Sequence, residues 1–161
     1  MTDWLRVLRR ALVSGSGAGL VSLVALACGG QRDCRSVFAP VNAVSHWIWR
    51  GAALRQQRPS LRYTLPGAGI HHAMSILWAL LFEERIAHAG SRLGAWRTMA
   101  TALGVSATAC FVDLRLTPER LTPGFERRLS PESLSAVYLA FALGLALPSF
   151  IGMLRRGLRR R

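Results

Sequence analysis

The stretch HHAMSILWALLFEE, residues 71–84, decides how the rest of the chain is interpreted. Two histidines stand at its head and two glutamates at its tail, with ten uncharged, mostly apolar residues between them. On a helix His72 and Glu83 share one face but lie about 16 Å apart along the axis, at about 1.5 Å per residue. They cannot bind one metal ion or exchange one proton directly. The stretch is therefore not one active site, and its pattern indicates a membrane span with two different polar ends.

The composition of the 161-residue chain favours a membrane protein. Hydrophobic residues make up 51%, and the 21 basic residues, all arginine, outnumber the 8 acidic ones, for a net charge of +13. A strongly basic chain can bind nucleic acid. Here, however, the arginines stand in short groups between long apolar segments, as membrane proteins place cations at the headgroup level. We therefore expect the lipid bilayer as partner and no nucleic acid. The groups are 6–10, 55–62 and 155–161.

Four segments are apolar enough to span a bilayer, which takes about 20 residues for about 30 Å of hydrocarbon. The last of them is the most clearly bounded, because Ser130 can cap its start and Pro131 suits the first helical position. We predict an all-α integral membrane four-helix bundle, in which residues 1–161 form a single domain. The predicted spans are 11–28, 65–82, 95–114 and 134–154.

The first segment permits a second interpretation. Arginines before an apolar run, followed by Ala25-Leu26-Ala27, resemble a secretory signal with a cleavage site, and Cys28 directly after it resembles a lipoprotein signal. The same features fit an uncleaved first span, which we favour. Gly15 and Gly19 form a GxxxG pair, which lets two helices approach closely in lipid.

The cysteines exclude some kinds of site. Cys28, Cys34 and Cys110 form no CxxC motif, so thioredoxin-type and zinc-knuckle sites are excluded. Cys28 and Cys34 can pair if they face an oxidising compartment. The alternative is three unpaired thiols.

Residues 40–50 are predicted to form one short helix, because Pro40 can start it and Gly51 can end it. Such a helix reaches only about half-way across a bilayer. Its polar residues follow helical spacing on one face. We interpret it as an amphipathic or re-entrant helix that lies at the interface or dips partway into it. A fifth full span is the alternative. Residues 115–130 are predicted to form an ordered connector, because Pro118 and Pro123-Gly124 favour turns.

The positive-inside rule does not decide the orientation, because four spans divide the arginines almost evenly between the two sides. Both termini are flanked by arginines. We therefore favour a multi-pass membrane protein with both termini in the cytoplasm.

The second and third spans form an antiparallel hairpin, since a short connection joins them. The hairpin brings the two histidines to the depth of Asp113, and Glu83 and Glu84 near Arg97. His71 and His72 point about 100° apart on a helix, so only one of them joins the cluster. Ionisable residues at membrane depth are functional-site hypotheses by default. The candidate polar cluster consists of Asn42, His46, His72, Asp113 and Arg115.

Two chemical interpretations of this cluster compete with a structural one. His46, His72 and Asp113 carry ligand types that bind a divalent metal or relay protons. In the structural interpretation these side chains satisfy backbone and arginine partners at the interface. We favour the structural interpretation and expect no metal and no cofactor. The rhomboid Gly-x-Ser-Gly motif is absent, and four histidines are too few for a membrane di-iron enzyme.

Several short motifs occur in order along the chain after residue 36. They are Asn42-Ala43-Val44-Ser45-His46-Trp47, His71-His72 with Ser75 and Trp78-Ala79, Glu83-Glu84, Val112-Asp113 and Leu121-Thr122-Pro123-Gly124-Phe125-Glu126. Taken in this order, they resemble a group of small, uncharacterised proteobacterial inner-membrane proteins, and the layout of spans is weakly similar to YagU-like proteins. The resemblance implies a four-helix membrane protein of the bacterial inner membrane with no assigned activity, and it brings no catalytic residues.

These patterns predict a non-enzymatic role in envelope maintenance or as an accessory subunit, with membrane proteins or further copies of the chain as partners. The alternative is a membrane enzyme, or an ion- or proton-handling protein, with a His/Asp site at one membrane face.

Overall fold

The computed structural model describes residues 3–89 and 94–159. The described residues are 83% helical and contain no strand. Four helices are long and apolar enough to cross a membrane. Each predicted span lies inside one of them, so the predicted all-α four-helix bundle is confirmed. They are α1 (Trp4–Cys34), α5 (Thr64–His88), α6 (Ala95–Phe111), which the π-helical turn η1 (Val112–Leu116) extends, and α7 (Pro131–Leu158).

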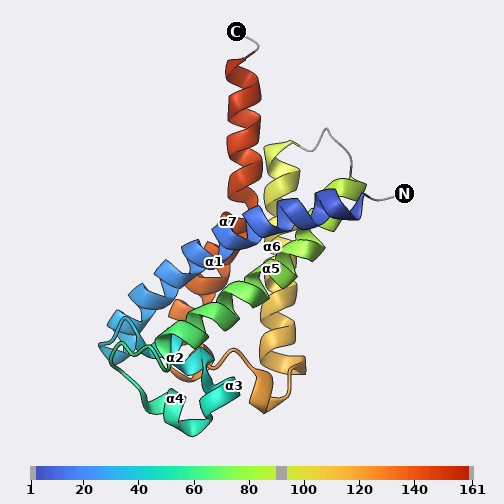
Figure 1. Cartoon of the computed structure of the whole chain (residues 1–161). Helices are drawn as coiled ribbons and strands as arrows, with labels where there is room; N and C mark the ends of the chain where they lie inside the picture. The colour runs from blue at the N-terminus through green and yellow to red at the C-terminus, as the bar shows by residue number, and fades with distance from the viewer. Residues whose placement is uncertain (1–2, 90–93, 160–161) are drawn as a thin grey trace.

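The four long helices form a ring of neighbours. α1 packs between α5 and α7, and α6 contacts the same two helices from the other side. Both described chain ends lie at one end of the bundle, which we call the terminal end (Figure 1). The three short helices gather at the opposite end, which we call the short-helix end. They are α2 (Ala39–Val44), α3 (His46–Trp49) and α4 (Gly51–Arg55).

Small residues let α1 approach α5 and α7 closely. A Cβ atom added to Gly15 would lie 2.6 Å from the Cα of Ile76 in α5, too close for any side chain. A Cβ atom added to Gly144 of α7 would lie 2.5 Å from the Cα of Ala18. The predicted GxxxG face of α1 is therefore the α1–α5 contact, and Ala18 forms the α1–α7 contact. Such small-residue crossings are typical of helices packed in lipid.

The ends of α1 and α7 follow from their sequences. Ser130 caps α7 by accepting a hydrogen bond from the Ser133 N–H at 3.3 Å, and Pro131 occupies the first turn, both as predicted. Asp33 of α1 accepts a second bond from the Ser130 N–H at 2.8 Å. The start of α7 is thereby fixed against the end of α1.

The helix α1 runs without a break through the segment that resembles a signal cleavage site. Leu26 within that segment, and Gly29 and Gly30 beyond it, are buried in the bundle. This packing favours the uncleaved span. Cys28 and Cys34 lie on the same helix, about 9 Å apart along its axis, whereas a disulfide needs Cα atoms within about 7 Å. The alternative of a Cys28–Cys34 disulfide is therefore wrong, and both thiols are free.

The structure corrects the single short helix predicted over residues 40–50. The helix begins as expected with Pro40 in its first turn, but it breaks at Ser45 and again at Arg50, whose φ is 51°. All six residues of α2 are buried, so α2 has no solvent or lipid face. It lies against α1 and α5, where a Cβ atom on Gly67 would overlap the Val41 carbonyl oxygen. Its polar residues bond to protein groups instead of water.

The connector between α6 and α7 is built from short turns. The 3₁₀ helices η2 (Glu119–Leu121) and η3 (Phe125–Arg127) lie on either side of Gly124, whose φ is +86°. A Cβ atom at Gly124 would meet the His46 ring and the Ala43 carbonyl. The connector therefore packs onto the short-helix end and directs Phe125 into the core.

Candidate functional site

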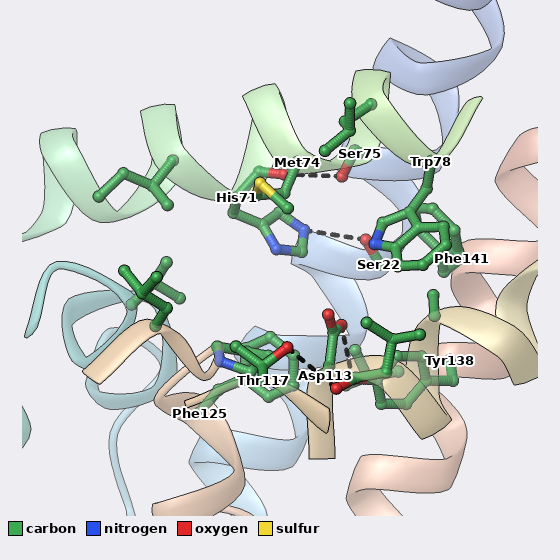
Figure 2. Close-up of a pocket in the computed structure, with 18 of the residues that line it drawn as sticks. Ser22, His71, Met74, Ser75, Trp78, Asp113, Thr117, Phe125, Tyr138 and Phe141 are labelled. Carbon is green, nitrogen blue, oxygen red and sulfur yellow. Dashed lines mark hydrogen bonds between the residues drawn. The ribbon is translucent and has the colours of Figure 1, made fainter. Parts of the chain in front are cut away.

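A cavity of about 420 Å³ lies toward the short-helix end of the bundle. We call it the α5–α6 cavity. Its walls come from residues 70–78 of α5, 109–113 of α6 and η1, and 137–141 of α7, and the connector contributes its floor. Figure 2 shows these side chains around the open space.

The cavity exists because two neighbouring helices diverge. α5 and α6 lie together near the terminal end and separate toward the opposite end (Figure 1). Two leucines that line the cavity also reach the surface: Leu77 of α5 is 55% exposed and Leu121 of η2 is 47% exposed. The cavity therefore opens on the surface of the bundle past apolar side chains.

His71 extends into the cavity from α5, where it bonds to Ser22 of α1 (Figure 2). The Ser22 hydroxyl donates to the Ala18 carbonyl at 2.7 Å. Its oxygen can then accept a hydrogen bond from His71 Nε2, which lies 2.9 Å away. This pattern assigns the ring proton to Nε2. It leaves Nδ1 as a hydrogen-bond acceptor.

Asp113 and Tyr138 form a second polar pair, below His71 in the view of Figure 2. The Tyr138 hydroxyl donates to Asp113 Oδ2 at 3.0 Å. Asp113 stands in the π-helical turn η1, and such turns often mark functional positions in helices. Tyr138 is held in turn by its backbone carbonyl, which accepts a hydrogen bond from Ser106 of α6 at 2.6 Å.

Trp78 supplies an unpaired donor to the same cavity. Its indole Nε1 is buried and has no hydrogen-bond partner within the described part of the chain. A buried donor without an acceptor costs about 1–3 kcal/mol. A ligand that offers an acceptor at this position would remove that cost. The cavity thus combines apolar walls with polar groups on two sides.

The structure brings one of the two adjacent histidines to Asp113, and it is His71. His72 is exposed on a different face of α5, with its Nε2 3.4 Å from the Ser16 hydroxyl of α1. The choice of His72 for the cluster was therefore wrong, whereas the shared depth of the histidine pair and Asp113 follows the predicted hairpin.

Asn42 and His46 hold the scaffold together near the cavity. Asn42 is fully buried, donates to the backbone carbonyls of Gln56 and Arg58 at 3.2 and 3.0 Å, and accepts from Thr64 at 2.6 Å. His46 is buried with Nδ1 2.9 Å from the Ala43 carbonyl. These contacts fix the segment that joins α2 to α5.

Arg115, the remaining member of the predicted cluster, is exposed and does not line the cavity. The structure does not bring His46, His72 and Asp113 together as a metal-binding set. Within residues 3–89 and 94–159, no three or more His, Cys, Asp or Glu side chains are placed so that they could hold a metal ion.

The glutamate end of residues 71–84 has other partners than predicted. Glu83 is buried beside Ser14 and Arg10 of α1. Glu84 pairs with Arg85 at 3.7 Å and with His88 at 3.4 Å, the latter at the expected i, i+4 spacing. Neither glutamate forms an ion pair with Arg97 in the part of the chain that the structure describes. The predicted hairpin places only α5 against α6. It therefore does not predict that α1 covers the face of α5 that carries Glu83.

Sequence reasoning missed three residues that give the cavity its polar character: Ser22, Trp78 and Tyr138. Ser22 and Tyr138 stand on α1 and α7, and no connection of the hairpin fixes where these helices pack. The spacing of the chain therefore carried no signal for Ser22 or Tyr138. Trp78 follows His71 at i+7 on α5, so helical spacing could have placed these two side chains on one face. Comparisons of the chain with protein-family models, with curated proteins and with solved structures find no match.

Proposed function

We propose that this protein is an integral protein of a bacterial inner membrane that binds a neutral amphiphile of the bilayer in the α5–α6 cavity. In this proposal it has a non-enzymatic accessory role, holding or presenting the molecule to other envelope components. Its resemblance to small proteobacterial inner-membrane proteins belongs to the same proposal. The observation that carries it is an apolar cavity that contains a buried, unpaired indole N–H.

The position of the cavity supports access from the lipid phase. Its rim is formed by Leu77 and Leu121, both partly exposed and apolar. It lies on a helix pair long and apolar enough to stand in a bilayer. The volume of about 420 Å³ falls within the range of about 300–1,000 Å³ that is usual for small-molecule sites. A polar head or ring would fill it while an apolar chain remained between the lipids.

The charge of the lining supports a neutral ligand. Described residues at the cavity include one histidine and one carboxylate but no arginine. Asp113 would repel an anion, and Glu126 of η3 lies close enough to Asp113 to add to this repulsion. A hydroxyl or carbonyl group, in contrast, would find the Trp78 N–H as donor and His71 Nδ1 as acceptor.

The arginine groups near the chain ends support the orientation. Arg6, Arg9 and Arg10 begin α1, and Arg155 and Arg156 end α7, all at the terminal end. The four spans divide the arginines almost evenly between the two ends of the bundle, so the orientation rests on the arginines that flank both chain termini. We therefore propose that both termini are cytoplasmic and that the cavity lies toward the periplasmic side.

A second candidate function rests on one observation: His71 and Asp113, both ionisable, face the same cavity. A proton-handling protein would need the carboxyl group of Asp113 to titrate, whereas an amphiphile-binding protein needs only its hydrogen bond. The variant Asp113→Asn keeps the hydrogen bond and removes the titration. Proteoliposomes with a pH-sensitive dye inside would report proton movement across the membrane. We expect no proton movement with the unmodified protein or with Asp113→Asn.

The direct test is lipid extraction from the protein purified in mild detergent, followed by mass spectrometry of the neutral fraction. We expect one neutral amphiphile to be enriched over the bulk membrane. Leu77→Trp, which places a larger ring at the rim, should abolish the enrichment. Leu139→Trp is the matched control, because Leu139 of α7 is equally exposed at 56% but does not line the cavity. Equal neutral lipid in all three proteins would refute the proposal.

A further inference from the structure

We propose a second, independent lipid site at the terminal end, where the phosphate of an anionic phospholipid binds to arginines of α1 and α7. The site is a hollow of about 1150 Å³ between the start of α1, the end of α5 and the last turns of α7. We call it the arginine hollow. It shares no lining residue with the α5–α6 cavity, so this inference does not depend on the function proposed above.

The arginine hollow follows from the crossing of two helices. α1 and α7 meet at Ala18 and Gly144, where no side chain fits between the backbones. Toward the terminal end the two helices separate, and α7 continues past the rest of the bundle (Figure 1). Arg9 of α1 and Arg156 of α7 thus come to line opposite sides of one open space.

The charges that line the hollow favour an anion. Arg6, Arg9, Arg10 and Arg156 outnumber the two carboxylates, Asp3 and Glu83. Arg6 is already paired with Asp3 at 3.3 Å. Arg9, Arg10 and Arg156 form no ion pair with any of the described residues. A phosphate group accepts charge-assisted hydrogen bonds from arginine in fixed, often bidentate geometry.

Glu83 explains why Arg10 alone is not the anion site. Glu83 as a residue is 5% exposed, and its carboxyl group lies beside Ser14 and Arg10. A buried carboxylate needs a nearby cation, so Arg10 is partly committed to Glu83. Arg9 and Arg156 remain as the two cations that a phosphate can bind without exposing Glu83.

The apolar part of the hollow indicates a lipid rather than a free phosphate. Val13, Ile86 and Met153 line it together with the arginines, and Val13 is 60% exposed. An acyl chain could lie along these side chains while its phosphate reached the arginines. Trp4 and Trp96, which are 64% and 78% exposed at the same end, match the aromatic residues that stand at the headgroup level of membranes.

Native mass spectrometry of the full-length protein in detergent tests this site, with phosphatidylglycerol and phosphatidylethanolamine of the same acyl chains as probes. We expect phosphatidylglycerol to bind at least about ten-fold more tightly. Arg9→Gln with Arg156→Gln should weaken its binding about thirty-fold, at about 1 kcal/mol per arginine near a lipid surface. This pair leaves Arg10 in place beside Glu83, so that the variant keeps its fold.

The matched control is Arg55→Gln with Arg58→Gln, which removes the same charge from exposed positions at the short-helix end. We expect it to bind phosphatidylglycerol like the unmodified protein. Glycerol phosphate, the soluble headgroup fragment, should not compete at millimolar concentration. Equal binding of both phospholipids, or equal weakening by both pairs of substitutions, would overturn the proposal. Competition by glycerol phosphate at the affinity of the lipid would overturn the lipid as ligand.

Discussion

The α5–α6 cavity and the arginine hollow lie toward opposite ends of one helix bundle and differ in the charge of the residues that line them. The cavity is apolar, contains no arginine and has an unpaired indole N–H. The hollow is wider and lined by four arginines and two carboxylates. If both proposals hold, one bundle discriminates between neutral and anionic lipids by the positions of its charged side chains.

The two spaces arise where different helix pairs diverge, α5 and α6 at the cavity and α1 and α7 at the hollow (Figure 1). α1 meets α5 at Gly15 and α7 at Ala18, through contacts that exclude side chains. Helices that touch so closely at one level and are not parallel must separate above and below it. Side chains fill only part of the space that results between α1 and α7, so the arginine hollow remains at the terminal end. The crossing of α1 and α7 should therefore control the shape of the arginine hollow.

The largest effect is expected from a methyl group at the crossing. Gly144→Ala places a Cβ atom 2.5 Å from the Cα of Ala18, and such overpacking typically costs about 1–3 kcal/mol. Gly104→Ala is the control, since nothing lies within 4 Å of a Cβ atom there and alanine favours a helix over glycine by about 1 kcal/mol. Thermal unfolding in detergent should give a lower melting temperature than the unmodified protein for Gly144→Ala and a higher one for Gly104→Ala. Equal stability would mean that the crossing is looser than described.

The next largest effect separates the two sites. Trp78→Phe removes the unpaired N–H from the α5–α6 cavity and should lower neutral-lipid retention about ten-fold, as expected for one buried hydrogen bond. Phosphatidylglycerol binding at the other end should stay unchanged. Trp96→Phe, at an exposed position of the terminal end, serves as the control. Retention of neutral lipid by Trp78→Phe would exclude the indole as its donor.

A smaller effect concerns the carboxylate of the cavity. Asp113→Asn keeps an oxygen that can accept from Tyr138, whereas Asp113→Ala leaves the buried hydroxyl without its partner, at a cost of about 1–3 kcal/mol. We expect a lower melting temperature for Asp113→Ala only. Neutral-lipid retention should be near normal in Asp113→Asn. Its loss there would favour a role for the charge itself, as in the proton-handling alternative.

Salt should have the smallest effect and should act at one end only. Raising the salt concentration from 0.1 to about 1 M shortens the screening length from about 10 to about 3 Å. Phosphatidylglycerol binding at the exposed arginines should weaken several-fold, and neutral-lipid retention should not change. Titrations of both lipids at the two salt concentrations measure this. If binding at the two sites were equally sensitive to salt, the proposed electrostatic difference between the sites would be contradicted.

The fold could be predicted from the sequence further than the candidate site. Local patterns in the sequence mark several features of the fold: the four apolar segments, the Ser130-Pro131 start of α7 and the glycine pair of α1. The depth of Asp113 also followed, because a short connection forces α5 and α6 to be antiparallel. No local sequence pattern, in contrast, predicts that α1 packs between α5 and α7. For that reason Ser22, Tyr138 and the α1 partners of Glu83 could not be predicted.

The choice between the two adjacent histidines shows the same limit. His71 and His72 are equivalent by spacing, and only the packing of α1 against α5 decides which one enters the cavity. Likewise, the polar face of residues 40–50 has the same spacing whether water or buried backbone satisfies it. In the structure Asn42 bonds to the backbone of residues 56 and 58, and α2 is buried on all sides.

The most direct test of two lipid sites with opposite preferences is a crossed measurement on three proteins. Lipids bound to the unmodified protein, to Leu77→Trp and to Arg9→Gln with Arg156→Gln are extracted and quantified by mass spectrometry. We predict that Leu77→Trp loses the neutral amphiphile and keeps phosphatidylglycerol, and that the arginine pair does the reverse. Loss of the same lipid class from both variants, or of neither class from either, would contradict the assignment of one class to each end.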